Sequence, residues 1–298
     1  MTPAARNFGR WATAAVWATL PLLAGPILAH ALDPRSALFQ RSASLGLWIV
    51  WGAGLVAALV PSTVALTALR ILAPASLTAV IWAVLASSDR ADTAASVALA
   101  VTSLVTVIAL SSFVGDRFVN GSSYGDERRL PLRAPAPLLF GPLELAWLVA
   151  VGGIVGGPLL LAARQWLPGL ILVVVGWPAA AIAIRALHGL SRRWIVFVPA
   201  GLVVVDQMVL ADALLVMRQR VAGLEIVDME VAAENDTDLT AGALGPRLRI
   251  ALSTPELIVP AVRRRSTPTE PFEVSAVRTA PSRPGWVLAE ARSRRLVV

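Results

Sequence analysis

The chain has 298 residues, of which 56% are hydrophobic and only 15% are charged, and it carries a formal net charge of +7. Soluble globular proteins average roughly 45–50% apolar and about 25% charged residues, so this composition is typical of a chain whose outer surface faces lipid. The sequence has no cysteine and only two histidines, which excludes disulfides, thiolate metal sites and a histidine-rich metal site; we predict no metal and no cofactor.

Six segments in the first 190 residues are predicted to be transmembrane helices, which need about 20 mostly apolar residues to cross about 30 Å of hydrocarbon. The predicted spans are residues 11–29, 44–60, 69–87, 93–114, 138–163 and 167–190. The stretch from Pro61 to Ser87 could instead form a short interfacial helix followed by a short span. Charged residues become dense from Ser191 onward. We therefore predict a transmembrane helical domain over residues 1–190 and a β-rich cytoplasmic domain over residues 191–298.

The arginines of the connecting segments indicate the orientation in the membrane. With the N-terminus inside, the inside segments carry nine arginines and the outside loops carry four. Both termini are then cytoplasmic, and we predict a multi-pass protein of the cell (plasma) membrane. The first span also has the features of a signal peptide cleaved near Ala29-His30-Ala31. Its apolar run over residues 11–29 exceeds the usual length of roughly 7–15 residues, which favours an uncleaved span.

The pattern changes after the last span, where short apolar runs bounded by turn residues are typical of β-strands. The Gly115–Pro137 segment before span five is predicted to be a cytoplasmic connection, because it combines turn residues, mixed charges and several prolines. We expect strands over residues 194–198, 201–206, 214–217, 224–227, 248–252, 257–259 and 272–277, with the fifth and sixth forming a hairpin, and a C-terminal helix over residues 282–296.

Several strands closed by one C-terminal helix resemble the bacterial PH-like domains that flank membrane spans. The residues that carry this resemblance are 193–204 (Arg-Trp-Ile-Val-Phe-Val-Pro-Ala-Gly-Leu-Val-Val), 221–227 and the C-terminal helix. The whole chain also resembles the polytopic membrane proteins common in high-GC actinobacteria. The PH-like resemblance implies an adaptor or assembly module, and it carries over no ligand residue.

Glu144 and Arg185 are charged residues that lie several residues inside predicted spans. Charges inside a bilayer are costly and usually pair or face the bundle interior. Both residues lie near the cytoplasmic ends of spans five and six, which a short loop joins, so we predict an intramembrane ion pair. It could be structural, or it could serve as a proton or anion relay. His30 and His188 are predicted to be polar residues of the membrane interfaces.

Small residues in span five form two overlapping GxxxG patterns, which let helix backbones approach closely in a bilayer. The glycines are Gly152, Gly153, Gly156 and Gly157. They are predicted to pack helices together, either within this bundle or in an interface with a second copy or a partner.

Two arginine clusters in the tail are predicted to contact the anionic inner leaflet, unless they form only a solvated face. The clusters are Arg263, Arg264, Arg265 and Arg292, Arg294, Arg295. No base-reading motif or aromatic stacking platform accompanies them, so we expect no nucleic acid partner.

No GxGxxG, Walker A, HExxH or GxSxG motif occurs in the chain, and we predict no enzymatic activity. The expected function is a membrane scaffold, assembly factor or accessory subunit of a cell-envelope complex. Its partners would be the lipid bilayer and a protein bound through the tail or span five. The alternative is a small transporter or channel for a hydrophobic or small solute, although the mid-membrane stretches hold only small, hydroxyl and apolar residues.

Overall fold

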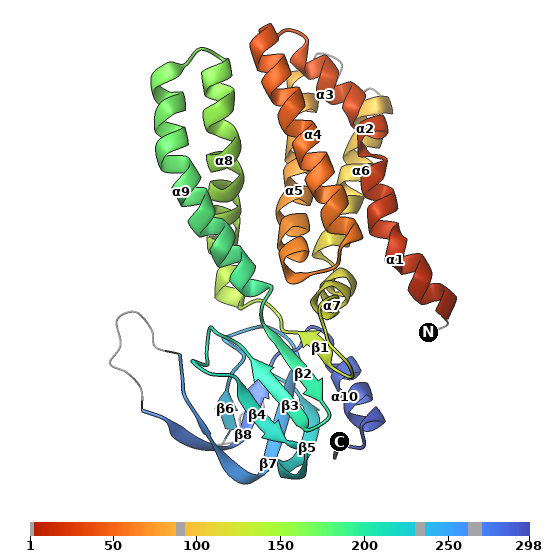
Figure 1. Ribbon diagram of the computed structural model, residues 1–298, viewed down its shortest axis with the longest axis vertical. Helices are drawn as coiled ribbons and strands as arrows, with labels where there is room; N and C mark the ends of the chain where they lie inside the picture. Colours follow the sequence, from red (N-terminus) through yellow and green to blue (C-terminus); the bar gives the residue numbers. More distant parts are fainter. Residues whose placement is uncertain (1–2, 88–92, 230–235, 262–269) are drawn as a thin grey trace. The chain divides into compact units, whose positions relative to one another are not determined.

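The computed structural model describes residues 3–87, 93–229, 236–261 and 270–298 (Figure 1). The chain forms two compact units. The helical unit comprises Met1–Gly121 and Leu145–His188, and the β unit comprises Ser122–Glu144 and Gly189–Val298. The second unit therefore includes a segment that precedes span five, whereas the sequence placed all of it after residue 190.

Within the described ranges, six helices are long and apolar enough to cross a membrane, as the sequence predicted. The spans are Trp11–Leu32, Ala37–Leu59, Thr63–Ala86, Thr93–Leu110, Pro142–Ala162 and Trp166–Leu190. The first span consists of α1 (Pro3–Ala18), α2 (Leu20–Leu23) and α3 (Gly25–Leu32), and the others are α4 (Ala37–Leu59), α5 (Thr63–Ala86), α6 (Thr93–Leu110), α8 (Pro142–Ala162) and α9 (Trp166–Leu190).

Serine caps decide where two of the spans begin. The Ser36 hydroxyl accepts a hydrogen bond from the Phe39 N–H at 3.4 Å, so α4 starts seven residues before the predicted Ser44. The Ser62 hydroxyl accepts one from the Ala65 N–H at 3.1 Å and starts α5. Such caps satisfy N–H groups that have no partner in the first helical turn. Helix α5 then continues through Pro74 as one span, so the alternative of a separate interfacial helix is wrong.

Helices α1 and α4 are joined by two tryptophans that bond each other's backbone. The Trp17 indole donates to the Trp51 carbonyl at 2.8 Å, and the Trp51 indole donates to the Trp17 carbonyl at 3.3 Å. Gly54 lies under the buried Trp17 ring, where a Cβ atom would come within 2.0 Å of the ring. These contacts satisfy indole N–H groups that lipid would leave without an acceptor.

Helix α7 (Ser112–Asn120) occupies the start of the segment that the sequence interpreted as a connection. Its buried side chains include Val114, Phe118 and Val119, and α7 packs on α5. Gly121 follows the helix at a point where a Cβ atom would meet the Pro61 carbonyl oxygen at 2.1 Å. This short amphipathic helix therefore belongs to the helical unit.

The β unit contains two four-stranded sheets and the helix α10 (Pro284–Ser293). One sheet has the order β1-β2-β3-β4 and the other has the order β5-β7-β8-β6. Every adjacent pair is antiparallel except β6 and β8, which are parallel. The strands are β1 (Arg128–Pro131), β2 (Trp194–Val198), β3 (Gly201–Val205), β4 (Leu214–Met217), β5 (Val221–Val227), β6 (Asp236–Asp238), β7 (Arg247–Ile258) and β8 (Phe272–Thr279).

A single apolar core joins both sheets and the C-terminal helix. Ile195 and Phe197 of the first sheet, Ile250 of the second and Val287 of α10 are each completely buried in it. Leu130 of β1 is 2% exposed in the same core. Strand β1 pairs with β2, with Leu130 opposite Ile195, so residues before span five complete a sheet that follows span six.

The predicted hairpin between residues 248–252 and 257–259 is wrong, because Arg247–Ile258 form the single strand β7. Its pairing with β8 shifts between Ala251 and Glu256, and Pro255 lies within that irregularity. Proline has no N–H to donate to a sheet, so it is tolerated at a bulge. The Ser-Thr-Pro sequence that resembles a turn is therefore a bulge.

Candidate functional site

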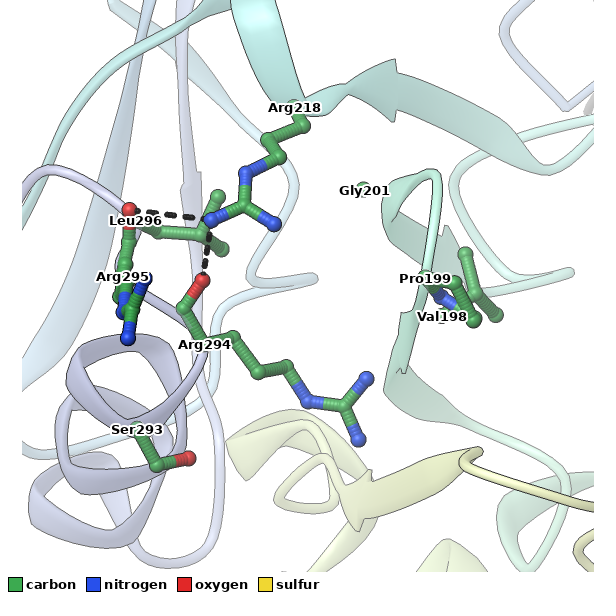
Figure 2. Close-up of a pocket in the computed structure, with 8 residues that line it drawn as sticks. All are labelled: Val198, Pro199, Gly201, Arg218, Ser293, Arg294, Arg295 and Leu296. Carbon is green, nitrogen blue, oxygen red and sulfur yellow. Dashed lines mark hydrogen bonds between the residues drawn. The ribbon is translucent and has the colours of Figure 1, made fainter.

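The β unit has a pocket of about 390 Å³ between the β2–β3 turn and the C-terminal end of α10 (Figure 2). Its lining combines three arginines with apolar side chains. The residues are Val198, Pro199, Gly201, Arg218, Ser293, Arg294, Arg295 and Leu296. Positive charge therefore gathers around a hollow that also has apolar walls.

The β2–β3 hairpin forms one wall because its backbone approaches the next strand closely. Gly201 opens β3, and a Cβ atom there would lie 2.1 Å from the Val216 carbonyl oxygen. The Arg218 N–H donates to the Ala200 carbonyl at 2.8 Å. The turn therefore requires glycine at residue 201 and holds the backbone of Arg218 beside the pocket.

The Arg218 side chain reaches across to the chain that leaves α10. Its Nη2 donates to the carbonyl oxygens of Arg294 at 2.5 Å and Arg295 at 3.4 Å (Figure 2). Arg295 has a positive φ of 57°, which turns the chain after the helix. Arg218 thus binds the exposed carbonyl groups at this helix end and is itself fixed at the edge of the pocket.

The three arginines of the pocket differ in how their charge is compensated. Arg294 forms an ion pair with Glu290 at 2.7 Å and also donates to the Asp126 carbonyl. Its guanidinium lies 5.8 Å from the centre of the Phe197 ring. Among the described residues, no carboxylate pairs with Arg218 or Arg295, and both are exposed. The net charge of the pocket is therefore positive.

The structure divides the predicted arginine clusters. Arg294 and Arg295 line the pocket, whereas Arg292 is exposed on α10 and does not. Arg263, Arg264 and Arg265 lie outside the described residues. Sequence reasoning missed Arg218, which is 76 residues from Arg294, because nothing local in the sequence indicates that the two residues meet.

A second charged cluster of the β unit joins strands of the other sheet. Asp236 of β6 is buried and lies 2.9 Å from Arg249 of β7 and 3.9 Å from Arg278 of β8. Arg249 also contacts Glu225 at 2.9 Å. The hydrogen bonds to Glu225 and Asp236 raise the pKa of Arg249 above its ordinary value. Arginine is protonated in proteins in any case, so this rise in pKa leaves the charge of Arg249 unchanged.

Glu144 and Arg185 belong to different compact units, and their pairing stays a prediction. The Glu144 carboxylate accepts a hydrogen bond from the Gly141 N–H at 2.9 Å, in the first turn of α8. A carboxylate at this position also interacts favourably with the positive end of the helix dipole. Arg185 is exposed on α9.

Three of the four glycines of span five lie against α9. A Cβ atom on Gly153 would come within 2.5 Å of the Gly176 carbonyl oxygen, and one on Gly157 would come within 2.6 Å of Val173. A Cβ atom on Gly156 would lie 2.5 Å from Leu172, whereas one on Gly152 would have nothing within 4 Å. The first three therefore allow α8 and α9 to pack closely as a hairpin (Figure 1), whereas there is open space beside Gly152.

Polar contacts of α5 join it to the α8–α9 hairpin. The Thr67 hydroxyl lies 2.9 Å from Nδ1 of His188, and the Trp147 indole donates to the Ile71 carbonyl at 3.0 Å. His188 was predicted to be an interfacial residue, and its contact with Thr67 was not foreseen. Arg70 lies one turn after Thr67 on α5, is partly buried, and has no hydrogen-bond or ion-pair partner among the described residues.

Among the described residues, no group of three or more histidines or acidic residues could hold a metal ion. A cavity of about 480 Å³ at the ends of α3 and α5 contains His30 and Asp33, whose Nδ1 and Oδ2 atoms are 3.7 Å apart. Both side chains are largely exposed, so the pair is weak. Comparison with protein-family models, curated proteins and solved structures finds no match to this chain.

Proposed function

We propose that this protein is a membrane scaffold, assembly factor or accessory subunit of a cell-envelope complex, and that its β unit is the cytoplasmic interaction module. The observation that carries the proposal is the pairing of β1 with β2. Because of this pairing, the β unit contains two segments of the chain, Ser122–Glu144 and Gly189–Val298. The first follows span four and leads into span five, and the second follows span six, so the chain passes between the two units three times. A folded domain attached in this way is suited to hold a partner at the membrane surface.

The connections between the β unit and the membrane helices are short. Three residues separate α9, which ends at Leu190, from β2, which begins at Trp194. An extended chain spans at most about 3.6 Å per residue, so a domain after this connection stays within reach of the leaflet. We place this domain on the cytoplasmic side because of the arginine distribution in the loops.

A PH-like character for the β unit is part of the same proposal. It is supported by two sheets that share one core and by the C-terminal helix, whose Val287 and Ala291 are completely buried in that core. Domains of this architecture suit an adaptor role because binding can use surfaces and loops without a catalytic cluster.

The test is cross-linking in native membranes, with a tag at the C-terminus and identification of the proteins recovered. We expect a stoichiometric partner that is lost from a chain lacking residues 191–298. A second variant, Leu130→Asp, should lose the same partner because it prevents β1 from joining the core. Leu139→Asp is the matched control, since Leu139 belongs to the same segment but is 42% exposed. The proposal would be contradicted if the partner were retained both by the chain lacking residues 191–298 and by Leu130→Asp.

A small transporter is the second candidate, and Arg70 is the observation that favours it. Arg70 lies within a span and has no ion-pair partner among the described residues. An ionisable residue inside a span is a functional-site candidate in a membrane protein. Transport would be favoured over the scaffold by two results together. The purified protein would bind no partner, and proteoliposomes would take up solute with the native chain but not with Arg70→Gln.

A further inference from the structure

We infer that the pocket between the β2–β3 turn and α10 binds a phosphate group, either of an anionic phospholipid headgroup or of a soluble phosphorylated molecule. The inference does not depend on which protein partner the β unit binds. Its three elements are the absence of a carboxylate partner for Arg218 and Arg295 among the described residues, the fixed position of Arg218, and a cavity of about 390 Å³.

The charge of the pocket selects an anion. Arg218 and Arg295 have no carboxylate partner among the described residues, and the ion pair with Glu290 offsets Arg294 only in part. Guanidinium groups present N–H donors in a planar fork that matches two phosphate oxygens at once. A phosphate carries more charge and more acceptor oxygens than a carboxylate, so it can accept hydrogen bonds from two guanidinium groups at once.

The hydrogen bonds of Arg218 prepare it for binding. Its Nη2 is held by the Arg294 and Arg295 carbonyls, while Nε and Nη1 have no partner among the described residues. Figure 2 shows the guanidinium at the edge of the hollow that faces Pro199 and Gly201. A side chain already fixed in position loses little conformational entropy when a ligand binds.

The helix end contributes an opposing partial charge, which Arg218 offsets with one of its guanidinium nitrogens. The C-terminal end of a helix carries a partial negative charge on its free carbonyls, and this would repel an anion. Here the Arg294 and Arg295 carbonyls each accept a hydrogen bond from Arg218, which reduces the negative charge that they present to the pocket.

The size and walls of the pocket indicate the kind of molecule. A volume of about 390 Å³ falls in the range of roughly 300–1,000 Å³ that is usual for small-molecule sites. Val198, Pro199 and Leu296 give it apolar walls. These walls suit the glycerol or another carbon portion attached to the phosphate, so the ligand is an organic phosphate and not the inorganic ion alone.

The test uses the full-length protein in nanodiscs of pure phosphatidylcholine, titrated with glycerol 3-phosphate in a calorimeter. A parallel titration uses inorganic phosphate. Native mass spectrometry of the protein mixed with phosphatidylglycerol or phosphatidylcholine provides the lipid arm. We expect saturable binding of an organic phosphate in at least one arm. Binding of glycerol 3-phosphate alone assigns a soluble ligand, and retention of phosphatidylglycerol alone assigns a headgroup.

The variants separate a pocket from diffuse surface charge. Arg295→Gln should weaken binding by about tenfold, because it removes one charged donor. The Arg295 side chain makes no hydrogen bond, ion pair or ring contact among the described residues, so this variant should fold normally. Arg218→Gln should weaken binding at least as much. Arg292→Gln removes the same charge from the exposed face of α10 and should leave the affinity unchanged. An equal loss with Arg292→Gln, or no binding in either arm, would overturn the inference.

Discussion

Arg193 and Asp206 form a buried ion pair that closes the β2–β3 hairpin at its open end. Nε and Nη2 of Arg193 donate to the two carboxylate oxygens of Asp206 at 2.8 and 2.6 Å, and both side chains are almost completely buried. Nη1 of Arg193 also donates to the Arg133 carbonyl at 2.8 Å, in the segment that contains β1. The pair thus joins the strand from before span five to the strands that follow span six.

Removing one partner of this pair should destabilise the β unit. Asp206→Ala leaves the Arg193 charge buried without compensation, which costs about 3–5 kcal/mol. In the full-length protein in detergent, we expect the β unit to become sensitive to limited proteolysis. We also expect its cooperative thermal unfolding to occur at a lower temperature. Asp212→Ala is the control, because Asp212 is exposed in the loop after β3. Equal protease resistance of the two variants would show that the pair is not needed for stability.

Strand β1 should be required for the stability of the β unit. Leu130→Ala removes a buried side chain from the shared core and should cost about 2–5 kcal/mol. Leu139→Ala changes an exposed residue of the same segment and should have little effect. Urea unfolding, followed by proteolysis of the β unit, measures the difference. A β unit that unfolds at the same urea concentration in both variants would mean that β1 is dispensable.

The spans and most strands could be predicted from sequence because their signals are local. Hydropathy indicates each span, and two short apolar runs separated by the Pro-Ala turn indicate β2 and β3 at nearly the observed bounds. Strand β1 could not be predicted in the same way. It is a four-residue segment with two arginines, and only its pairing with β2, two spans later in the chain, makes it a strand.

The candidate site was predicted less completely than the fold. Composition indicated the arginines after α10, and Arg294 and Arg295 do line the pocket. Arg218 lies in a short turn between β4 and β5, and its role depends on a contact with residues far away in sequence. Charge density alone also could not distinguish Arg292, which is outside the pocket, from Arg295, which is in it.

The glycines of α8 give a matched test of helix packing. Gly153→Leu should lower the thermal stability in detergent by about 1–3 kcal/mol, because its side chain would meet the backbone of Gly176. Gly152→Leu introduces the same side chain where nothing lies within 4 Å, and it should be tolerated. A change of particle size with Gly152→Leu alone would instead indicate that this open face contacts a second copy. Equal stability of both variants would argue against close packing of α8 on α9.

The orientation can be measured directly because the native chain has no cysteine. Single cysteines in place of Tyr124 and Gln165 are suitable, since both residues are exposed and they lie in connections at opposite ends of the membrane helices. With the N-terminus inside, a membrane-impermeant maleimide should label Gln165→Cys in intact cells and Tyr124→Cys only after the membrane is opened. The reverse pattern would invert the topology and place the β unit outside.

The proposed pair of Glu144 and Arg185 can be separated from a simple helix cap by a double-mutant cycle. The Glu144 carboxylate already accepts the Gly141 N–H, so Glu144→Ala should lower thermal stability in detergent through loss of the cap by about 1 kcal/mol, whether or not the pair forms. Glu144→Gln keeps an acceptor oxygen and removes the charge, so its effect reports on the pair and the helix dipole. If the pair exists, adding Arg185→Ala to Glu144→Gln should cost little more than the first change alone. Fully additive losses would leave Glu144 as a cap of α8 and Arg185 as an independent residue of α9.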